Sequence, residues 1–334
     1  MSSTSDTIKQ LRLPLIILVT YAHSYGYVTE GYSLLSGWDT YEVLKLLISQ
    51  TIVKVAMPTF FVMSGYLFFA NVTEWNVHIY WGKIKRRIQT LLVPYLVWNL
   101  LMAVKLKTFN WAVFWVFWSK AGVQTDWLGH EQLMTAPANM PLWFLRDLIV
   151  VSLFTPIIYI GIKRFGYWLI GLITILYLSG ICAFIPGLSA YAIYFFVLGA
   201  FLSIRKMDLT DTFMKYERVA YLLTVSLAIT MMATYQTAVF SSFMLCFRLT
   251  GVVAVFCLAN RILSTTSLRI PQVACDSSYF IYLAHYVFFL SFIDTAFFSI
   301  CSYSTWSLVT HYLFCPILKI TCFVIVYYIY RRIR

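Results

Sequence analysis

Long apolar stretches, separated by short polar segments, fill almost the whole chain. A helix that crosses a membrane needs about 20 largely apolar residues. By this criterion the sequence predicts about ten transmembrane helices, near residues 11–28, 43–70, 88–107, 142–162, 167–185, 189–204, 218–235, 239–260, 278–300 and 308–330. The predicted fold class is therefore an all-α, polytopic membrane protein in which residues 1–334 form a single transmembrane domain.

The longest segment between predicted helices, residues 108–141, is too short to fold alone and is expected to be an extracytoplasmic loop. Within it, Trp111, Trp115 and Trp118 recur at helical spacing. Tryptophan is typical of membrane interfaces, so this spacing predicts an amphipathic interfacial helix. Stacking of these rings on a sugar is the alternative.

Composition agrees with the hydropathy pattern, because 61% of the 334 residues are hydrophobic and only 11% are charged. The net charge of +12 would suggest nucleic acid in a soluble protein, but here the basic residues cluster between apolar stretches, so no nucleic-acid partner is expected. With both termini cytoplasmic, the inner helix ends collect Lys9, Arg12, Lys83, Lys85, Arg86, Arg87, Lys163, Arg164, Arg205, Lys206, Lys215, Arg218, Arg261, Arg269, Arg331, Arg332 and Arg334. The outer loops keep little beyond Lys107 and Lys120, and losing one helix would invert every later cluster.

The seven cysteines form no C-x-x-C pair and lie mostly within apolar stretches, so we interpret them as small core residues and expect no metal site. The first apolar stretch lacks a small-residue cleavage site, so we expect a retained helix and no signal peptide.

The first predicted helix, "RLPLIILVTYAHSYG", carries Arg12 and His23. Eleven residues at 100° each amount to three turns plus about 20°, so both side chains share one face about 16 Å apart along the axis. Arg12 then lies at the cytoplasmic end and His23 near mid-membrane. Ionisable groups inside a span are costly and usually face a polar cavity. The alternatives are an arginine that sets topology and a histidine that bonds to a neighbouring helix.

A second histidine is predicted at a similar depth. The ninth span begins "DSSYFIYLAHYVFF", with Asp276 or a following serine as the expected N-cap. This start places His285 about 12 Å from the cytoplasmic end of the helix. A neutral histidine can take a proton from a hydroxyl group, which is the chemistry that acyl transfer needs.

A basic cluster opens the third predicted helix, with Lys83, Lys85, Arg86 and Arg87 ahead of Pro94. Lys83 shares a helix face with Arg86 or Arg87. One interpretation is a topology anchor that touches anionic lipid. The other is a cradle for a phosphate-rich cofactor, for which arginine supplies paired donors.

Further polar residues suggest where a hydroxylated acceptor binds. Lys54 lies too deep in the second helix for easy snorkelling and is expected to face the interior, while the Ser64–Gly65 pair is expected to allow close packing. Towards the outer side lie Glu30, Asp39, Arg146, Asp147, Asp294 and His311. Together these residues could line an outward vestibule, whereas Arg146 and Asp147 could instead pair locally.

The order of these motifs resembles the membrane acyltransferase type 3 family, multispan bacterial O-acyltransferases that modify surface glycans. The resemblance rests on Arg12 and His23, "FFVMSGYLFF", "KIKRR" followed by "TLLVPYLVW", "PLWFLRDL" and "SYFIYLAH", and it runs from residue 9 to about residue 290. It implies about ten helices around a cavity that receives acyl-coenzyme A from the cytoplasm. It also implies that His23 is the essential histidine, Arg12 its partner, the Lys83–Arg87 cluster the acyl-donor motif and His285 a late second histidine.

The function expected from this resemblance is an integral O-acyltransferase of the bacterial inner membrane. It would transfer an acetyl group from acetyl-coenzyme A to a hydroxyl of an envelope or exported polysaccharide, or of a lipid-linked glycan. His23 would be the general base and His285 an orienting group or second proton carrier, and an acyl-histidine relay stays open. The rival is a carrier or exporter of a glycan precursor, lined by Lys54, Arg146, Asp147 and the histidines. A receptor or scaffold would leave the pairing of Arg12 with His23 unexplained.

Overall fold

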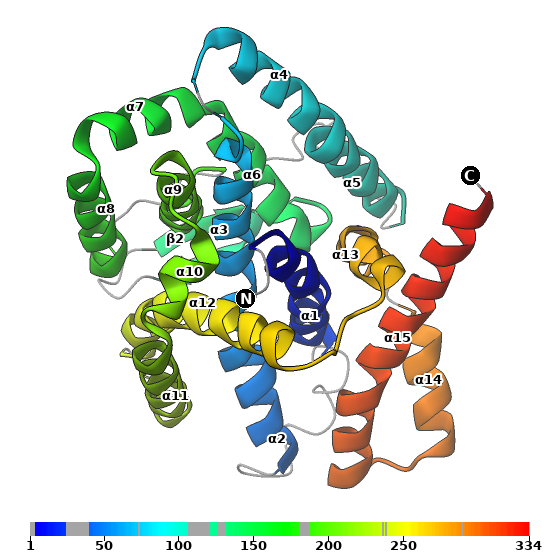
Figure 1. Cartoon of the computed structure of the whole chain (residues 1–334). Coiled ribbons are helices and arrows are strands. Elements are labelled where there is room, and N and C mark those ends of the chain that lie inside the picture. The colour runs from blue at the N-terminus through cyan, green and yellow to red at the C-terminus, as the bar shows by residue number, and fades with distance from the viewer. Residues whose placement is uncertain are drawn as a thin grey trace.

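Helices make up almost all of the part of the chain that the structure, a computed structural model, describes (Figure 1). That part is residues 4–24, 40–72, 74–105, 120–125, 131–135, 137–180, 187–235, 237, 239–288 and 290–333. The α-helices are α1 (Thr4–Ser24), α2 (Thr40–Lys45), α3 (Ala56–Phe69), α4 (Val77–Arg87), α5 (Val93–Lys105), α6 (Trp143–Leu153), α7 (Thr155–Phe165), α8 (Tyr167–Ser179), α9 (Ala190–Ile204), α10 (Leu209–Met214), α11 (Glu217–Ala233), α12 (Phe240–Thr265), α13 (Gln272–Ala284), α14 (Ser291–Ile300) and α15 (Thr305–Ile333).

Short π and 3-10 segments connect several of these helices. The π segment η2 (Leu46–Thr51) and the 3-10 turn η3 (Ile52–Val55) join α2 to α3, η4 (Ile88–Leu92) joins α4 to α5, and η6 (Met140–Leu142) precedes α6. Residues Thr40–Phe69 and Val77–Lys105 are therefore continuous helical rods.

The loop between α5 and η6 contains an antiparallel hairpin of β1 (Lys120–Thr125) and β2 (Glu131–Thr135), with Val123 opposite Leu133. The sequence pattern did not predict these strands. The expected interfacial helix with Trp111, Trp115 and Trp118 lies outside the described residues.

The helical membrane class is confirmed. Within the described residues, four helices are long and apolar enough to cross a membrane: Thr40–Phe69, Val77–Lys105, Phe240–Thr265 and Thr305–Ile333. A fifth crossing is reached if Met140–Leu153 and Thr155–Phe165, bent by 62°, are counted as one. Each of the ten predicted ranges contains a helix, but several helices are shorter than a full span. The count of ten crossings stays a prediction.

Two predicted spans are not single straight helices. Residues 142–162 divide into α6 and α7 at the 62° bend, where Pro156 stands in the first turn of α7 and lacks a backbone N–H for a continuous helix. Residues 278–300 divide into α13, which ends at Ala284, and α14, which begins at Ser291. The expected N-cap at Asp276 is wrong, because α13 already begins at Gln272, after Pro271.

Short polar and glycine signals fix other helix ends. The side chains of Asn76, Ser189 and Asp208 accept hydrogen bonds from the backbone N–H three residues later and so start α4, α9 and α10. Gly180 follows α8 in the left-handed conformation that glycine adopts without a Cβ penalty.

The first helix lies at the centre of the bundle (Figure 1). It packs against α3, α10, α12, α13 and α15, and also against η2 and η3. Leu15, Ile16 and Val19 on α1 are almost fully buried within the core. Because other helices surround α1, its polar side chains from Thr20 onwards are buried or half-buried among protein side chains.

Helices α3 and α9 pack closely through two glycines. A Cβ atom on Gly65 would overlap the carbonyl oxygen of Phe196, and one on Gly199 would overlap that of Val62. Small residues at such positions let two membrane helices approach backbone to backbone. The close-packing role expected for the Ser64–Gly65 pair is confirmed for Gly65.

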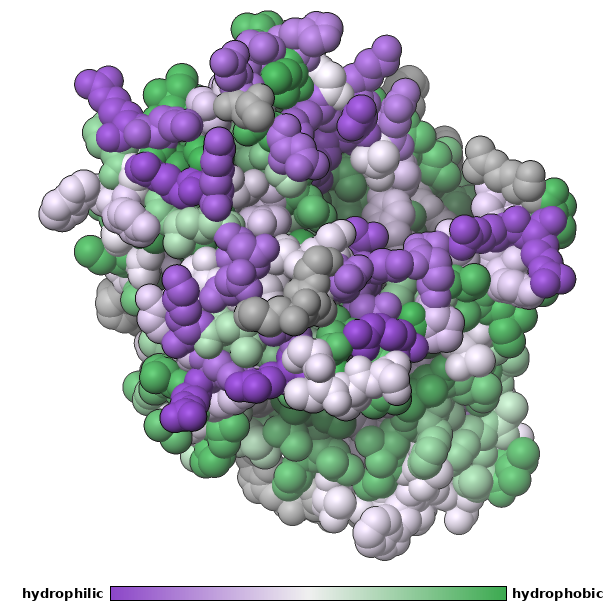
Figure 2. Space-filling view, viewed as in Figure 1, coloured by the Kyte–Doolittle hydropathy of each residue, from purple (hydrophilic) through white to green (hydrophobic). Residues whose placement is uncertain are grey.

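The two ends of the described chain lie at the same end of the bundle. Gln10, near the start of α1, exchanges hydrogen bonds with the backbone of Ile270, and Arg331, near the end of α15, bonds to Asp276 at 2.9 Å. Ile270 and Asp276 are six residues apart at the start of α13. Figure 2 shows hydrophilic side chains gathered over the upper and middle part of the face nearest the viewer, with hydrophobic ones below. An even number of crossings fits this arrangement, while the cytoplasmic side stays a prediction.

Candidate functional site

A mostly apolar cavity of about 280 Å³ lies beside the first half of α1. Helices α1, α3, α6 and α13 contribute to its wall, together with the junction of α4 and η4. Its lining residues are Ile8, Arg12, Ile16, Met57, Phe60, Met63, Ser64, Leu67, Arg87, Leu91, Phe144, Leu145, Leu148, Ser278, Tyr279 and Tyr282. Such a space suits a ligand with an apolar part and a charged end.

Two arginines, Arg12 and Arg87, are the cationic residues of this lining. The Arg87 guanidinium donates to the Ser64 hydroxyl at 2.9 Å and lies 5.3 Å from the centroid of the Phe68 ring. These contacts hold Arg87 against α3, while Arg12 is exposed near the start of α1. The cavity therefore has two guanidinium groups, which are suited to phosphate, from two helices far apart in sequence.

The rest of the predicted basic cluster does not face this cavity. The ammonium group of Lys83 lies 5.3 Å from the Phe68 ring centroid, one helical turn before Arg87. Lys85 and Arg86 are exposed and are not among the residues that line the cavity. The structure thus separates the four basic residues: Arg87 lines the cavity, Lys83 flanks it, and Lys85 and Arg86 are exposed outside the lining.

The two predicted histidines come together from α1 and from the end of α13. The ring centroids of His23 and His285 lie 5.4 Å apart, and the Tyr286 ring lies 5.6 Å from His23. The two histidines are 262 positions apart, so this contact is set by the packing of α1 against α13.

The hydrogen bonds of His285 define which of its nitrogens is available. Its Nδ1 lies 2.8 Å from the carbonyl oxygen of Tyr282 and 3.2 Å from that of Ile281. A carbonyl oxygen only accepts, so Nδ1 carries a hydrogen and donates it. In the neutral ring Nε2 is then the unprotonated nitrogen. Nε2 is buried and has no hydrogen-bond partner among the described residues. A neutral imidazole with a free Nε2 lone pair is a suitable proton acceptor.

The histidine pair lies beyond the cavity, further along α1 and α13, and neither histidine is among its lining residues. Tyr282 lines the cavity, and its ring centroid lies 6.2 Å from that of His285, one turn further along α13. On α1, His23 follows the cavity residue Ile16 by seven positions, or about 10 Å. One face of α1 therefore joins the guanidinium end of the cavity to the histidines.

A lysine lies close to His23. Lys54, in the 3-10 turn between α2 and α3, is near enough to His23 and to Arg248 to interact electrostatically with both. Arg248 on α12 did not stand out in the sequence, because it lies in an apolar span with no motif around it. The only sequence signal is its charge near the middle of a predicted transmembrane helix.

The Arg146–Asp147 pair on α6 is closed off from solvent. Arg146 is 1% exposed and Asp147 0%. The Arg146 guanidinium contacts one carboxylate oxygen of Asp147 at 3.1 Å, and the Ser189 hydroxyl donates to the other at 2.7 Å. This is the local pairing given as the alternative, and it corrects the expectation that these two residues line an open vestibule.

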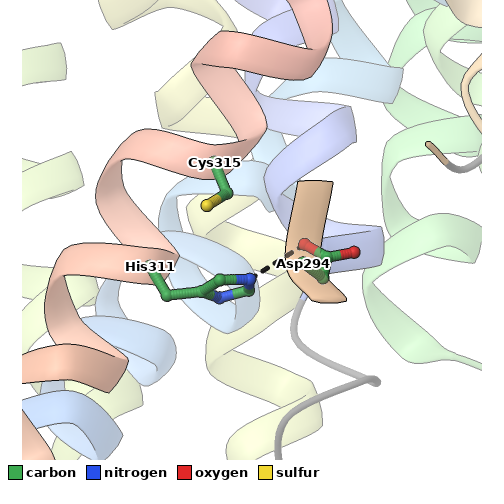
Figure 3. A group of neighbouring side chains, drawn as sticks. All are labelled: Asp294, His311 and Cys315. Carbon is green, nitrogen blue, oxygen red and sulfur yellow. Dashed lines mark hydrogen bonds and ion pairs between the residues drawn. The ribbon is translucent and has the colours of Figure 1, made fainter. Parts of the chain in front are cut away.

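Asp294 and His311, also expected in the vestibule, belong to a buried ion network between α14 and α15 (Figure 3). His311 Nε2 lies 2.8 Å from one Asp294 oxygen, and the Lys319 ammonium donates to the other at 2.7 Å. Cys315 lies close enough that one ligand atom from each of Asp294, His311 and Cys315 falls within 4.8 Å of the others. The lysine ammonium on the same carboxylate disfavours a metal ion there, because it already compensates the negative charge.

The remaining predicted vestibule residues, Glu30 and Asp39, lie outside the described residues.

These features define a helical membrane protein with two contacting histidines beyond an apolar cavity that carries guanidinium groups. Residues 6–330 match the family described as an acyltransferase domain. The chain therefore belongs to this acyltransferase family, and the resemblance inferred from the sequence is confirmed.

A curated relative gives a narrower comparison. The chain is 23% identical over 171 residues to the succinoglycan biosynthesis protein ExoH of Rhizobium meliloti (strain 1021). The aligned part covers 49% of this chain and 45% of the relative, so the match spans less than half of the relative's length. Comparison with solved structures gives no match.

Proposed function

We propose that this chain is an integral O-acyltransferase of the bacterial inner membrane that transfers an acetyl group from cytoplasmic acetyl-coenzyme A to a hydroxyl of an envelope or exported polysaccharide sugar. Membership of the acyltransferase family and the similarity to a succinoglycan biosynthesis protein support an acyl transfer to a glycan. The observation that carries the proposal is the contact of His23 with His285 beyond a cavity that contains Arg12 and Arg87.

In this proposal the phosphates of coenzyme A bind Arg12 and Arg87. Guanidinium groups suit phosphate because they present several N–H donors in one plane. The apolar lining then accepts the acyl-bearing arm, and the thioester reaches towards the histidines. Lys83 contributes charge at the edge of this site, whereas Lys85 and Arg86 are exposed and suit contact with anionic lipid.

The histidine pair moves the proton of the reaction. Nε2 of His285, or the ring of His23 beside it, accepts the proton of the sugar hydroxyl while the oxygen attacks the thioester carbonyl. The carbon–sulfur bond breaks, the ester forms, and the coenzyme A thiolate takes the proton back from the imidazolium. The products are an O-acyl sugar and coenzyme A with a free thiol. The second histidine keeps the base oriented through ring contact.

Release of the coenzyme A thiol tests this function. We expect purified protein in lipid nanodiscs, given acetyl-coenzyme A and a de-O-acetylated polysaccharide, to release thiol and to acetylate the glycan. His23→Ala should lower the rate by about 10²- to 10⁴-fold, which is the usual contribution of a general base.

His78→Ala is the matched control, because His78 is exposed at the start of α4, and it should retain the wild-type rate. An active His23→Ala variant would contradict the mechanism. A protein that moves glycan but binds no coenzyme A would instead be the carrier or exporter considered above.

A further inference from the structure

Lys54, which lies close to His23, and Arg248, which lies close to Lys54, differ from the other interior cations of the described chain. Lys319 pairs with Asp294, Arg146 with Asp147, Lys105 donates to the carbonyl of Val287, and Arg87 donates to Ser64. In contrast, Lys54 and Arg248 form no ion pair with any carboxylate of the described residues.

Packing holds these two cations close together. Lys54 belongs to η3, which contacts both α1 and α12. The next residue, Val55, packs so tightly on Gly251 of α12 that a side chain at Gly251 would overlap it, and Val55 also shares a buried cluster with Phe247. Arg248 follows Phe247, so η3 and α12 bring both positive charges to one place, where they repel each other.

Buried polar atoms lie around Arg248. The guanidinium carbon is 4.7 Å from the centroid of the Tyr191 ring, so one of its faces is covered. Its Nε is buried without a hydrogen-bond partner among the described residues. The hydroxyl of Tyr177, a residue that is only 4% exposed, lies beside the guanidinium, close enough to interact with it. Buried donors without acceptors are rare, because each costs the desolvation of its polar group.

Two cations within a membrane bundle need a compensating negative charge. We propose that Lys54, Arg248 and Tyr177 form a binding site for an anionic group, a carboxylate or phosphate, carried by the substrate that reacts at the histidine pair. The ammonium supplies a point charge, the guanidinium a planar set of donors, and the Tyr177 hydroxyl a further donor.

The position of Lys54 links this site to the reaction. Lys54 interacts electrostatically with His23 as well as with Arg248, so an anion held there lies beside the reacting centre and apart from the guanidinium groups of the cavity. The inference rests on the proposed acyl transfer. The anionic group has two sources: the far end of an acyl group that carries a second carboxylate, or an acidic substituent on the acceptor glycan.

A comparison of charged and neutral substrates tests the site and identifies its source. For the donor, we measure kcat/KM for charged donors (malonyl-, succinyl- and glutaryl-coenzyme A) and for neutral donors (acetyl-, butyryl- and valeryl-coenzyme A). The ratio of the charged to the neutral values reports recognition of the second carboxylate. For the acceptor, an acidic polysaccharide is compared with the same polysaccharide after carboxyl reduction. Lys54→Met and Arg248→Met should lower one of these two ratios about tenfold or more, since hydrogen bonds to charged groups are the strong ones.

Conservative variants separate charge recognition from folding. Arg248→Lys keeps the positive charge and should retain part of the selectivity, and Tyr177→Phe removes only the hydroxyl and should give a smaller loss. If the methionine variants change charged and neutral substrates equally, or change neither, the anion site is wrong.

Direct binding makes the result independent of acyl transfer. Sodium glutarate and sodium phosphate, each at millimolar concentration, should raise the thermal unfolding temperature of the wild-type protein but not that of the Lys54→Met/Arg248→Met double variant. Stabilisation of the wild type without transfer to any acceptor would overturn the proposed function and leave the site standing. No selective stabilisation by either anion, in a protein that does transfer acyl groups, would overturn the site alone.

Discussion

Arg86 and Arg87 illustrate at the residue scale what sequence alone cannot decide. Both stand in one basic run, and helical periodicity lets either share a face with Lys83. The structure places Arg87 in the cavity, bonded to Ser64, and leaves Arg86 exposed. Which of the two faces inward depends on how α4 is rotated against α3, and that rotation is set by tertiary packing.

Arg87 and Arg86 give a prediction and its control, because the two arginines are adjacent but only Arg87 lines the cavity. Arg87→Met should weaken binding of coenzyme A by about 10- to 100-fold, because it removes charge-assisted hydrogen bonds to phosphate. Arg86→Met should change the affinity little. Calorimetric titration of the purified protein with coenzyme A measures both. Equal affinities for the two variants would show that the phosphates bind elsewhere.

At the scale of elements, the tight contact of α3 with α9 holds the wall of the cavity in place. Gly65→Ala should destabilise the protein by about 1–3 kcal/mol or more. The added methyl group would meet the backbone of Phe196, which cannot rotate out of the way as a flexible side chain can. Gly171→Ala on α8 is the control, because nothing lies within 4 Å of its Cβ position. There the substitution should be neutral or stabilise by up to about 1 kcal/mol. Thermal unfolding in detergent compares them, and equal effects would contradict the close packing.

The ion network between α14 and α15 gives a second prediction at this scale. Asp294→Asn removes the charge that compensates Lys319, and a buried cation left without its partner costs about 3–5 kcal/mol. The double variant Asp294→Asn/Lys319→Met removes both charges and should recover part of the loss. Unfolding measurements that show no recovery would mean that the carboxylate stabilises the fold mainly through His311 or another contact.

The hydropathy pattern predicted the helices better than their breaks. All ten predicted ranges contain helix, because an apolar run long enough for a membrane has few other structures available. The bend after Leu153 and the gap between Ala284 and Ser291 were missed, since both lie inside continuous apolar runs. Breaks of this kind are stabilised by contacts with neighbouring helices, which a single sequence does not show.

At the scale of the whole molecule, the site could be predicted in part. The helical spacing of Arg12 and His23 was sufficient to place both on one face of α1, and the depth of His285 suggested its partner. Arg248 was missed because its role depends on the approach of α12 to η3. Arg146 and Asp147 were expected to line a vestibule, because two adjacent charged residues in a sequence do not show whether their side chains are buried.

The orientation of the molecule gives a prediction at the same scale. In a variant that lacks the seven native cysteines, a cysteine introduced by Lys85→Cys should react with a membrane-impermeant maleimide only from the cytoplasmic side. A cysteine from Ser302→Cys, in the exposed turn between α14 and α15, should react only from outside. Labelling of intact and opened cells compares the two, and reaction of both sites from one side would contradict the predicted topology.

The central claim is that the histidine pair performs acyl transfer on a donor bound in the cavity beside α1. Single-turnover transfer of radiolabelled acetyl from acetyl-coenzyme A to the glycan by the His285→Ala variant tests it most directly, with the affinity for coenzyme A measured on the same preparation. We predict an affinity within about twofold of the wild type and a transfer rate lower by about 10²- to 10⁴-fold. Transfer at the wild-type rate, or a loss explained wholly by weaker binding of coenzyme A, would contradict the account.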